Sequence, residues 1–136
     1  MNAEIFVKRI NKIDAIVQIK RKQYQRLVDV AEGVSSGFSA GDRVQSSPNL
    51  HKGADAVAGY VMIEDEINKL LDEKIGILAV LERLPEKEYE VLYAYYVDEK
   101  GLKEIAFEHQ KSYEWAKKKK HDALWRLQRI LDKNVF

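Results

Sequence analysis

Four polar side chains near the C-terminal end could do chemistry on another molecule: Tyr113, Glu114, Lys117 and Lys118. Their spacing of i, i+1, i+4 and i+5 places them along one face of a helix. They carry hydrogen-bond donors and acceptors, and these are the groups with which a helix distinguishes base edges in the major groove. We therefore expect them to form the reading face of a helix that binds duplex DNA.

The flanking segments have the layout of a helix-turn-helix, which would hold such a face in place. Residues 102–109 predict a two-turn helix, and Gln110 and Lys111 form a tight turn after it. Ser112 is a good N-cap for a longer helix that runs to about Asp132. An inward stripe of that helix is expected to pack on the preceding helices; it comprises Ala116, Ala123, Leu127 and Ile130, with Ile105, Ala106, Val91, Leu92 and Tyr95 as partners.

The segment upstream of the helix-turn-helix predicts a supporting helix. Pro85 suits a first helical position, and the helical pattern continues to Val97. Residues 98–101 form a turn, in which Gly101 is able to take positive φ.

The N-terminal part predicts two long helices that fold back on each other. Residues 3–33 repeat apolar side chains at alternating four- and three-residue steps, which is typical of a coiled-coil seam; its members are Phe6, Ile10, Ile13, Val17, Tyr24, Leu27 and Ala31, with Lys20 in the missing position. A second helix is expected from about 54 to 84, after a flexible loop over 34–53 that is rich in Ser and Gly. The predicted fold is all-α: a long antiparallel helical hairpin over 1–84, then a three-helix DNA-binding domain over 85–136.

Composition narrows the class of protein. Residues 100–136 carry ten basic and five acidic side chains, whereas residues 82–99 carry two and six. The chain has no cysteine, and neither a signal peptide nor a membrane-spanning segment is evident. His109 and His121 lack the further ligands that a zinc site needs. With no phosphate loop or activated nucleophile either, we expect a cytoplasmic protein that is not an enzyme and binds no cofactor, metal or membrane.

The same residues resemble a known family. Leu102-Lys103-Glu104-Ile105-Ala106, then Ser112, then Ala123-Leu124 and Leu127, look like region 4 of bacterial sigma factors, and Leu84 to Leu92 is similar to the entry helix of that region. The long N-terminal helix, the loop from Gly41 to Ser47 and Asp55-Ala56-Val57 resemble a phage- and prophage-encoded family close to late-gene transcription regulators. This resemblance implies a place in the cytoplasm of a bacterial host cell.

The resemblance implies roles for individual residues. Tyr113, Glu114 and Lys118 match base-contacting positions, and Trp115 and Lys117 match positions at or near phosphates. Glutamate can accept from cytosine N4, and lysine can donate to guanine O6 or N7. The chain departs from the pattern at His109, Gln110, Lys111 and Lys119. The full set of expected DNA-contacting residues is Ser112, Tyr113, Glu114, Trp115, Lys117, Lys118, Lys120 and Lys103.

Several alternatives stay open at this point. A run such as Lys117 to Lys120 is often only a solvated helix face, and the tyrosines of 89–113 could stack on single-stranded bases. Beside the leading hypothesis, a transcription regulator that dimerises through the hairpin, the sequence is compatible with a sigma-like protein that contacts RNA polymerase. It is also compatible with a component of DNA packaging similar to small terminase subunits.

Overall fold

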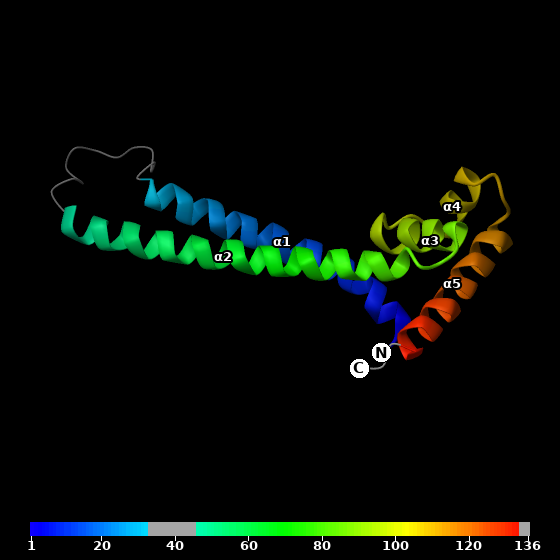
Figure 1. Ribbon diagram of the computed structural model, residues 1–136. Coiled ribbons are helices and arrows are strands. Elements are labelled where there is room, and N and C mark those ends of the chain that lie inside the picture. Colours follow the sequence, from blue (N-terminus) through cyan, green and yellow to red (C-terminus); the bar gives the residue numbers. More distant parts are fainter. Residues whose placement is uncertain (33–45, 134–136) are drawn as a thin grey trace. The chain divides into compact units, whose positions relative to one another are not determined.

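The computed structural model describes residues 1–32 and 46–133, with only the backbone described for 46–55. This part of the chain is all-α, and its elements are α1 (Ala3–Ala31), α2 (Ser46–Leu81), α3 (Glu86–Leu92), the π-helical turn η2 (Tyr93–Val97), α4 (Leu102–Glu108) and α5 (Tyr113–Lys133) (Figure 1). The predicted hairpin followed by a three-helix unit is confirmed. The chain divides into two compact units, Asp14–Asp72 and Met1–Ile13 with Glu73–Phe136.

The unit Asp14–Asp72 is an antiparallel pair formed by α1 and α2. The ring of Tyr24 meets the ring of Tyr60 edge to face, with 5.4 Å between centroids. The ammonium of Lys20 donates to the Glu66 carboxylate across the pair. Gly59 lets the helices approach closely, because a Cβ there would stand 3.1 Å from Cδ1 of Leu27. The inward stripe predicted for α1 is therefore the one that faces α2 in this unit.

Helix α2 begins at Ser46, eight residues before the start expected from the sequence. Pro48 is compatible with this start, since the first backbone N–H groups of a helix have no partner within the helix. A loop was expected over 34–53, but residues 46–53 belong to α2. Residues 34–45 lie outside the described part of the chain.

The second unit joins the first turns of α1 and the last turns of α2 to the helix-turn-helix. Val7, Ile10, Ile13, Leu81 and Leu92 are fully buried. The sequence predicted Phe6 in the seam, but Val7 occupies that place and Phe6 is half-buried. The buried stripe of α1 starts at Ala3, and steps of four and then three residues lead from it to Val7 and Ile10.

The beginning of α1 is held against α5 by one side chain. Oε1 of Gln128 accepts from the backbone N–H of Ala3 at 2.8 Å, and its Nε2 donates to the carbonyl of Met1 at 2.7 Å. The N–H of Ala3 belongs to the first turn of α1 and has no partner within that helix. Gln128 therefore satisfies the first N–H of α1, while the side chain of Asn2 accepts from the N–H groups of Glu4 and Ile5, and it holds α1 against α5 in the same unit.

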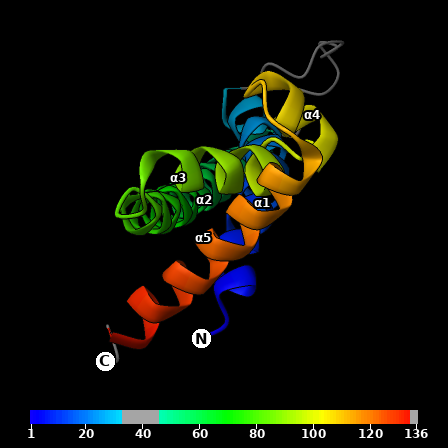
Figure 2. The same cartoon turned by 90° about the vertical axis from the view of Figure 1, so that its right-hand side faces the viewer.

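The predicted supporting helix divides into α3 and the π-helical η2, while α5 crosses α3 (Figure 2). At the end of η2 the chain reverses through Glu99, which takes φ 58°. Gly101 does not use its freedom to take positive φ: it is extended, with φ −73° and ψ 157°, and directly precedes α4. The side chain of Asn11 donates to the carbonyl of Tyr96 and so satisfies a backbone group of η2.

Candidate nucleic-acid interface

The turn between α4 and α5 is a complete helix C-cap built without glycine. Gln110 takes φ 57°, the left-handed region that usually favours glycine. Its N–H donates to the carbonyl of Phe107 at 3.0 Å, and the N–H of Lys111 donates to the carbonyl of Ala106 at 2.8 Å. These two bonds are the Schellman pattern, in which the carbonyls left free at a helix end are satisfied. The unusual turn sequence is therefore compatible with a standard turn geometry.

Helix α5 starts with a side-chain cap. The hydroxyl of Ser112 accepts from the N–H of Trp115 at 3.1 Å, as the sequence predicts for an N-cap. Beyond the cap, Glu114, Lys117 and Lys118 are exposed, and Tyr113 is 43% exposed. The structure thus brings these four side chains to the solvent side of the first turns of α5.

Two other candidates, Trp115 and Lys120, are placed against the protein itself. Trp115 is half-buried and packs on the core of the unit, and its ring lies 5.2 Å from that of His109. The ammonium of Lys120 lies 4.0 Å from the ring centroid of Tyr95, within the range of a cation–π contact. Lys119 is half-buried as well, as expected for a lysine on the core side of the helix. The lysine run therefore has two exposed and two half-buried members.

Helix α4 presents a second surface beside the turn. Lys103 is exposed, and Phe107, one turn later on the same face, is 83% exposed. The sequence analysis singled out Lys103 but not Phe107. The exposure of Phe107 could have been predicted from the sequence. It lies four residues after Lys103, in a helix whose core side is formed by Ile105 and Ala106.

The reading face is supported by a small core of apolar side chains. Ala116 on α5 is fully buried against Ile105 and Ala106 of α4 and against Val91 and Ala94. Ala123 and Leu127 continue this buried stripe, as predicted, whereas Ile130 is half-buried. The small side chain of Ala116 lets α5 approach α4 closely, which fixes the direction of the exposed face of α5.

Two ion pairs brace the helix-turn-helix at its edges. Nε of Arg126 donates to Oε1 of Glu88 at 3.0 Å, and the Glu88 side chain is only 6% exposed. The ammonium of Lys100 donates to both carboxylate oxygens of Glu108, at 2.9 and 3.1 Å. This hydrogen bond raises the pKa of Lys100 above its usual value. The turn before α4 is thereby tied to the end of α4.

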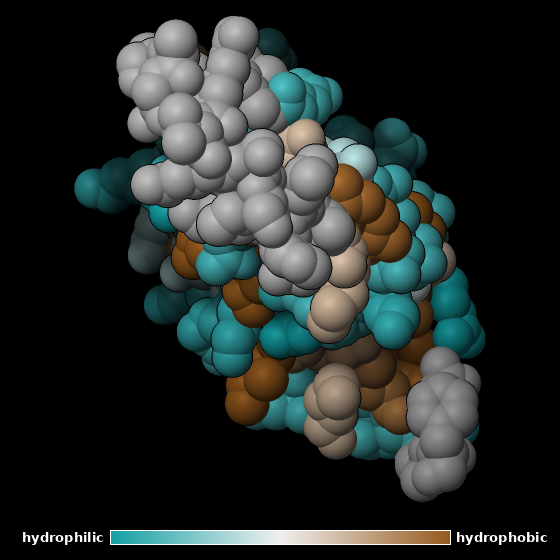
Figure 3. Space-filling model, turned by 90° about the vertical axis from the view of Figure 1, so that its left-hand side faces the viewer, coloured by the Kyte–Doolittle hydropathy of each residue, from teal (hydrophilic) through white to brown (hydrophobic). Residues whose placement is uncertain are grey.

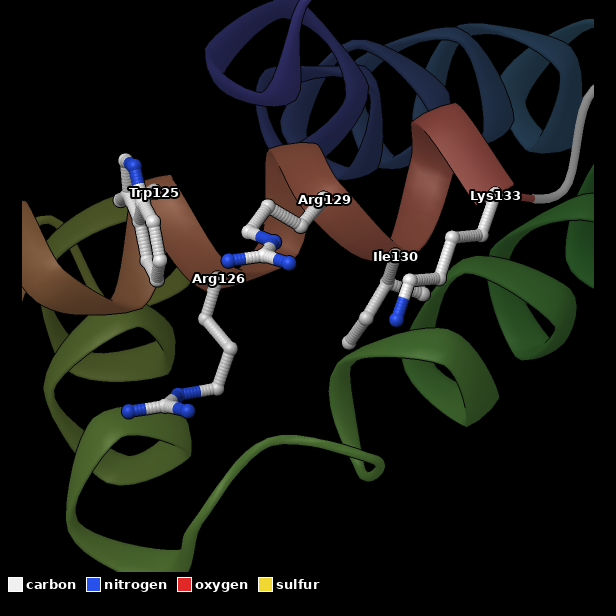
Figure 4. A pocket seen from close by; sticks show the side chains of 5 residues that line it. All are labelled: Trp125, Arg126, Arg129, Ile130 and Lys133. Atoms are coloured by element: carbon white, nitrogen blue, oxygen red, sulfur yellow. The ribbon is translucent and has the colours of Figure 1, made fainter.

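The C-terminal half of α5 bears a cationic hollow that the sequence analysis did not single out. The guanidinium of Arg129 lies 4.8 Å from the ring centroid of Trp125, which is 53% exposed. With Arg126, Ile130 and Lys133, these side chains line a hollow of about 180 Å3 (Figure 4). The sequence signal for it is the spacing of 125, 126, 129 and 133 on one side of a helix. The hollow continues the cationic surface of α5 beyond the lysine run.

The described residues hold no group of three or more His, Cys, Asp or Glu side chains that could bind a metal ion. Within the same residues, no helix has the length and apolar character needed to cross a membrane.

Helices α4 and α5 form a helix-turn-helix. The first helix is short, the turn is tight, and the second helix is longer and has an exposed polar face at its start. Residues 80–129, which run from the end of α2 through most of α5, match the family described as sigma-70, region 4. That match indicates DNA binding by the helix-turn-helix. Neither a curated protein nor a solved structure matches the chain.

Proposed function

We propose that the protein is a sequence-specific DNA-binding regulator of phage or prophage transcription that reads duplex DNA with α5. The observation that carries this proposal is the exposed face of Glu114, Lys117 and Lys118 at the start of α5. This face stands on the capped and packed helix-turn-helix that matches sigma-70, region 4.

The proposed contacts divide by chemistry. Tyr113, Glu114 and Lys118 would meet base edges, with the Glu114 carboxylate accepting from cytosine N4 and the Lys118 ammonium donating to guanine O6 or N7. Lys117 and Trp115 would lie at phosphates, which set the register of the helix on the duplex. Ser112 and Lys103 flank the same face and belong to the proposed set. Lys120 completes the set, but it lies over the ring of Tyr95, so we propose a smaller contribution to binding for it.

A titration of the full chain against labelled duplex DNA tests this proposal. Fragments that bind can be selected from a random library and compared with promoter regions of phage genes. Combined Lys117→Ala and Lys118→Ala should weaken binding at least tenfold, because two contacts of the reading face are lost. The matched control combines Lys69→Ala and Lys87→Ala, two exposed lysines outside α4 and α5. Binding that is absent at low salt for every sequence, or equal in both variants, would overturn the proposal.

We further propose that residues 85–136 act as the DNA-binding domain and residues 1–84 as a hairpin that brings copies of the chain together. In a two-fold dimer, two reading helices about 34 Å apart would meet successive turns of the same face of DNA. Selected sites with two half-sites at that spacing would support a dimer on DNA. Single, unpaired sites would contradict it.

A second candidate function is contact with RNA polymerase, and the acidic surface upstream of the helix-turn-helix favours it. Glu82, Glu86, Asp98 and Glu99 are exposed in the described part of the chain. Capture of purified RNA polymerase that is lost in Glu82→Lys with Glu86→Lys, while DNA binding persists, would support this function. A third candidate, a packaging component of the small terminase kind, predicts a ring of many copies and is tested by the mass of the protein in solution.

A further inference from the structure

Helix α1 carries a second stripe on the side that faces away from α2. In the unit Asp14–Asp72 its members follow one another at four- or three-residue steps, and all are exposed: Ala15, Ile19, Lys22, Arg26 and Val30. Ile19 is 57% exposed and Val30 is 42% exposed. Steps of this size keep side chains on one face of a helix. The outward stripe of α1 is therefore a continuous face of apolar and basic residues.

Helix α2 carries an outward stripe of the same period but of opposite charge. Its exposed members are Ala58, Val61, Asp65, Asn68 and Asp72. Val61 is 47% exposed, and its neighbours Val57 and Met62, at 42% and 63%, widen the apolar end of the stripe.

The pair of helices does not cover these apolar side chains by itself. Among the described side chains of this unit, only the apolar side chains of Val17 and Ala56 are buried. The other apolar side chains between the two helices are half-buried. Figure 3 shows brown apolar side chains exposed among teal polar ones on one face of the molecule. Val57, Val61 and Met62 lie within two turns of α2, and exposed apolar side chains grouped in this way mark an interaction site.

The charges of the two stripes identify the partner. Lys22 and Arg26 make the α1 stripe basic, and Asp65 and Asp72 make the α2 stripe acidic. Within the described part of the chain, none of these four takes part in an ion pair. Two α1 stripes, or two α2 stripes, would bring like charges together, which opposes association. An α1 stripe and an α2 stripe from different copies would bring opposite charges together.

The register of the hairpin places one pair of complementary charges, Lys22 and Asp65, at the same level, whereas Arg26 and Asp72 lie at different levels. Lys20 and Glu66 bond to each other across the pair, so the positions next to them along the two antiparallel helices are also level. Lys22 lies two residues after Lys20 on α1, and Asp65 lies one residue before Glu66 on α2. Because the two helices are antiparallel, both steps run in the same direction along the pair, so Lys22 and Asp65 stay close to one level. A copy laid beside another in the same register would therefore set Lys22 opposite Asp65.

We propose that the hairpin binds further copies of this chain head to tail, with the outward stripe of α1 in one copy packed on the outward stripe of α2 in the next. The two stripes lie on opposite sides of the hairpin, so each contact leaves one stripe of each kind free. Contacts of this type lead to closed rings or to longer assemblies rather than to a two-fold dimer. The inference concerns residues 14–72 and does not depend on DNA binding.

Sedimentation velocity and native mass spectrometry of the full chain at low salt test this inference. We expect species larger than a dimer that grow with concentration or close into a ring. Lys22→Glu with Arg26→Glu, and separately Asp65→Lys with Asp72→Lys, should each weaken assembly at least tenfold. A mixture of the two variants should assemble again, because each then offers the charge that the other lacks. Arg21→Glu, an exposed charge of α1 outside the stripe, is the matched control.

Circular dichroism of each variant establishes that the helices are retained. A wild-type chain that stays monomeric or stops at a dimer would overturn the inference. Assembly that survives both charge reversals, or a mixture that fails to reassemble although both variants are folded, would overturn it as well. Assembly beyond a dimer would contradict the two-fold dimer proposed for the hairpin, and a chain that stops at a dimer would favour it. DNA binding by α5 is measured separately and does not depend on which arrangement holds.

Discussion

Arg126 of α5 donates through Nε to the carboxylate of Glu88 of α3, over 3.0 Å, and the Glu88 side chain is almost completely buried. A carboxylate in that position needs a partner, because burial of an unpaired charge is costly. The pair therefore ties the recognition helix to its support at a point beyond the reading face. Arg126 itself is 48% exposed, so solvent screens part of the interaction.

Removal of the arginine should destabilise the helix-turn-helix. Arg126→Ala is expected to lower the free energy of unfolding by about 1–2 kcal/mol, since it leaves a buried carboxylate without its partner. Urea denaturation followed by circular dichroism measures this. Arg129→Ala is the control, and Arg126→Ala combined with Glu88→Gln should recover part of the loss. Equal loss in Arg126→Ala and Arg129→Ala would contradict the role of the pair.

Lys117 and Lys120 should affect DNA binding differently although both belong to the lysine run. Lys117 is exposed, so Lys117→Ala should reduce the slope of log affinity against log salt by about 0.9 through loss of one phosphate contact. Lys120 lies over the ring of Tyr95, so Lys120→Ala should change that slope less. Anisotropy titrations at several salt concentrations give both slopes. A larger slope change for Lys120→Ala would show that Lys120 leaves Tyr95 on binding.

The contact between Lys120 and Tyr95 should contribute to folding. Its loss in Lys120→Ala is expected to lower the free energy of unfolding by about 0.5–1 kcal/mol, the size of a partly exposed cation–π contact. Thermal or urea denaturation of Lys120→Ala beside Lys118→Ala, which removes an exposed lysine, separates the contact from the general effect of charge. The idea fails if the two variants are equally stable.

Replacement of Gln110 by glycine should make the protein more stable. Its φ of 57° strains a residue with a Cβ, so Gln110→Gly is expected to raise the free energy of unfolding by about 0.5–1 kcal/mol. Lys111→Gly, one residue later and outside the positive-φ region, should lower it instead. Urea denaturation of both variants measures the sign, and a loss in Gln110→Gly as large as in Lys111→Gly would contradict the turn geometry.

Tyr96 should make the stability depend on pH in the alkaline range. Burial raises the pKa of Tyr96 to about 12, and its hydroxyl has no hydrogen-bond partner among the described residues. The unfolded chain loses this proton near its ordinary pKa of 10.0, whereas the folded chain keeps it to about 12. Stability is therefore fully present below pH 10 and should fall as the pH rises towards 12.

Replacement by phenylalanine tests this account of Tyr96. Tyr96→Phe removes an unpaired buried hydroxyl and should leave the free energy of unfolding at neutral pH unchanged or raise it by about 1 kcal/mol. It should also weaken the fall in stability above pH 10 and remove one late step from the ultraviolet titration of tyrosine. Tyr113→Phe, at an exposed position, is the control. A clear loss of stability in Tyr96→Phe would contradict an unpaired hydroxyl.

The sequence by itself determined the local elements of this protein, because the signals for them are local. Apolar spacing marked the buried faces of α1 and α5, and Ser112 marked the start of α5 through its own hydroxyl. The spacing of 102–127 was sufficient to predict the helix-turn-helix. The early start of α2 at Ser46 was missed because Ser, Pro and Gly favour turns when they are read one residue at a time.

Only the tertiary structure decided what each polar side chain does. Lys117 and Lys120 belong to the same lysine run, but the packing of α5 on its neighbours exposes the first and sets the second over Tyr95. Similarly, the cap of Gln128 on Ala3 joins residues at opposite ends of the chain, and no local pattern encodes it. Positive φ falls on Glu99, where the N–H groups of Asp98 and Lys100 on either side donate to the carbonyls of Tyr93 and Ala94 at the end of η2.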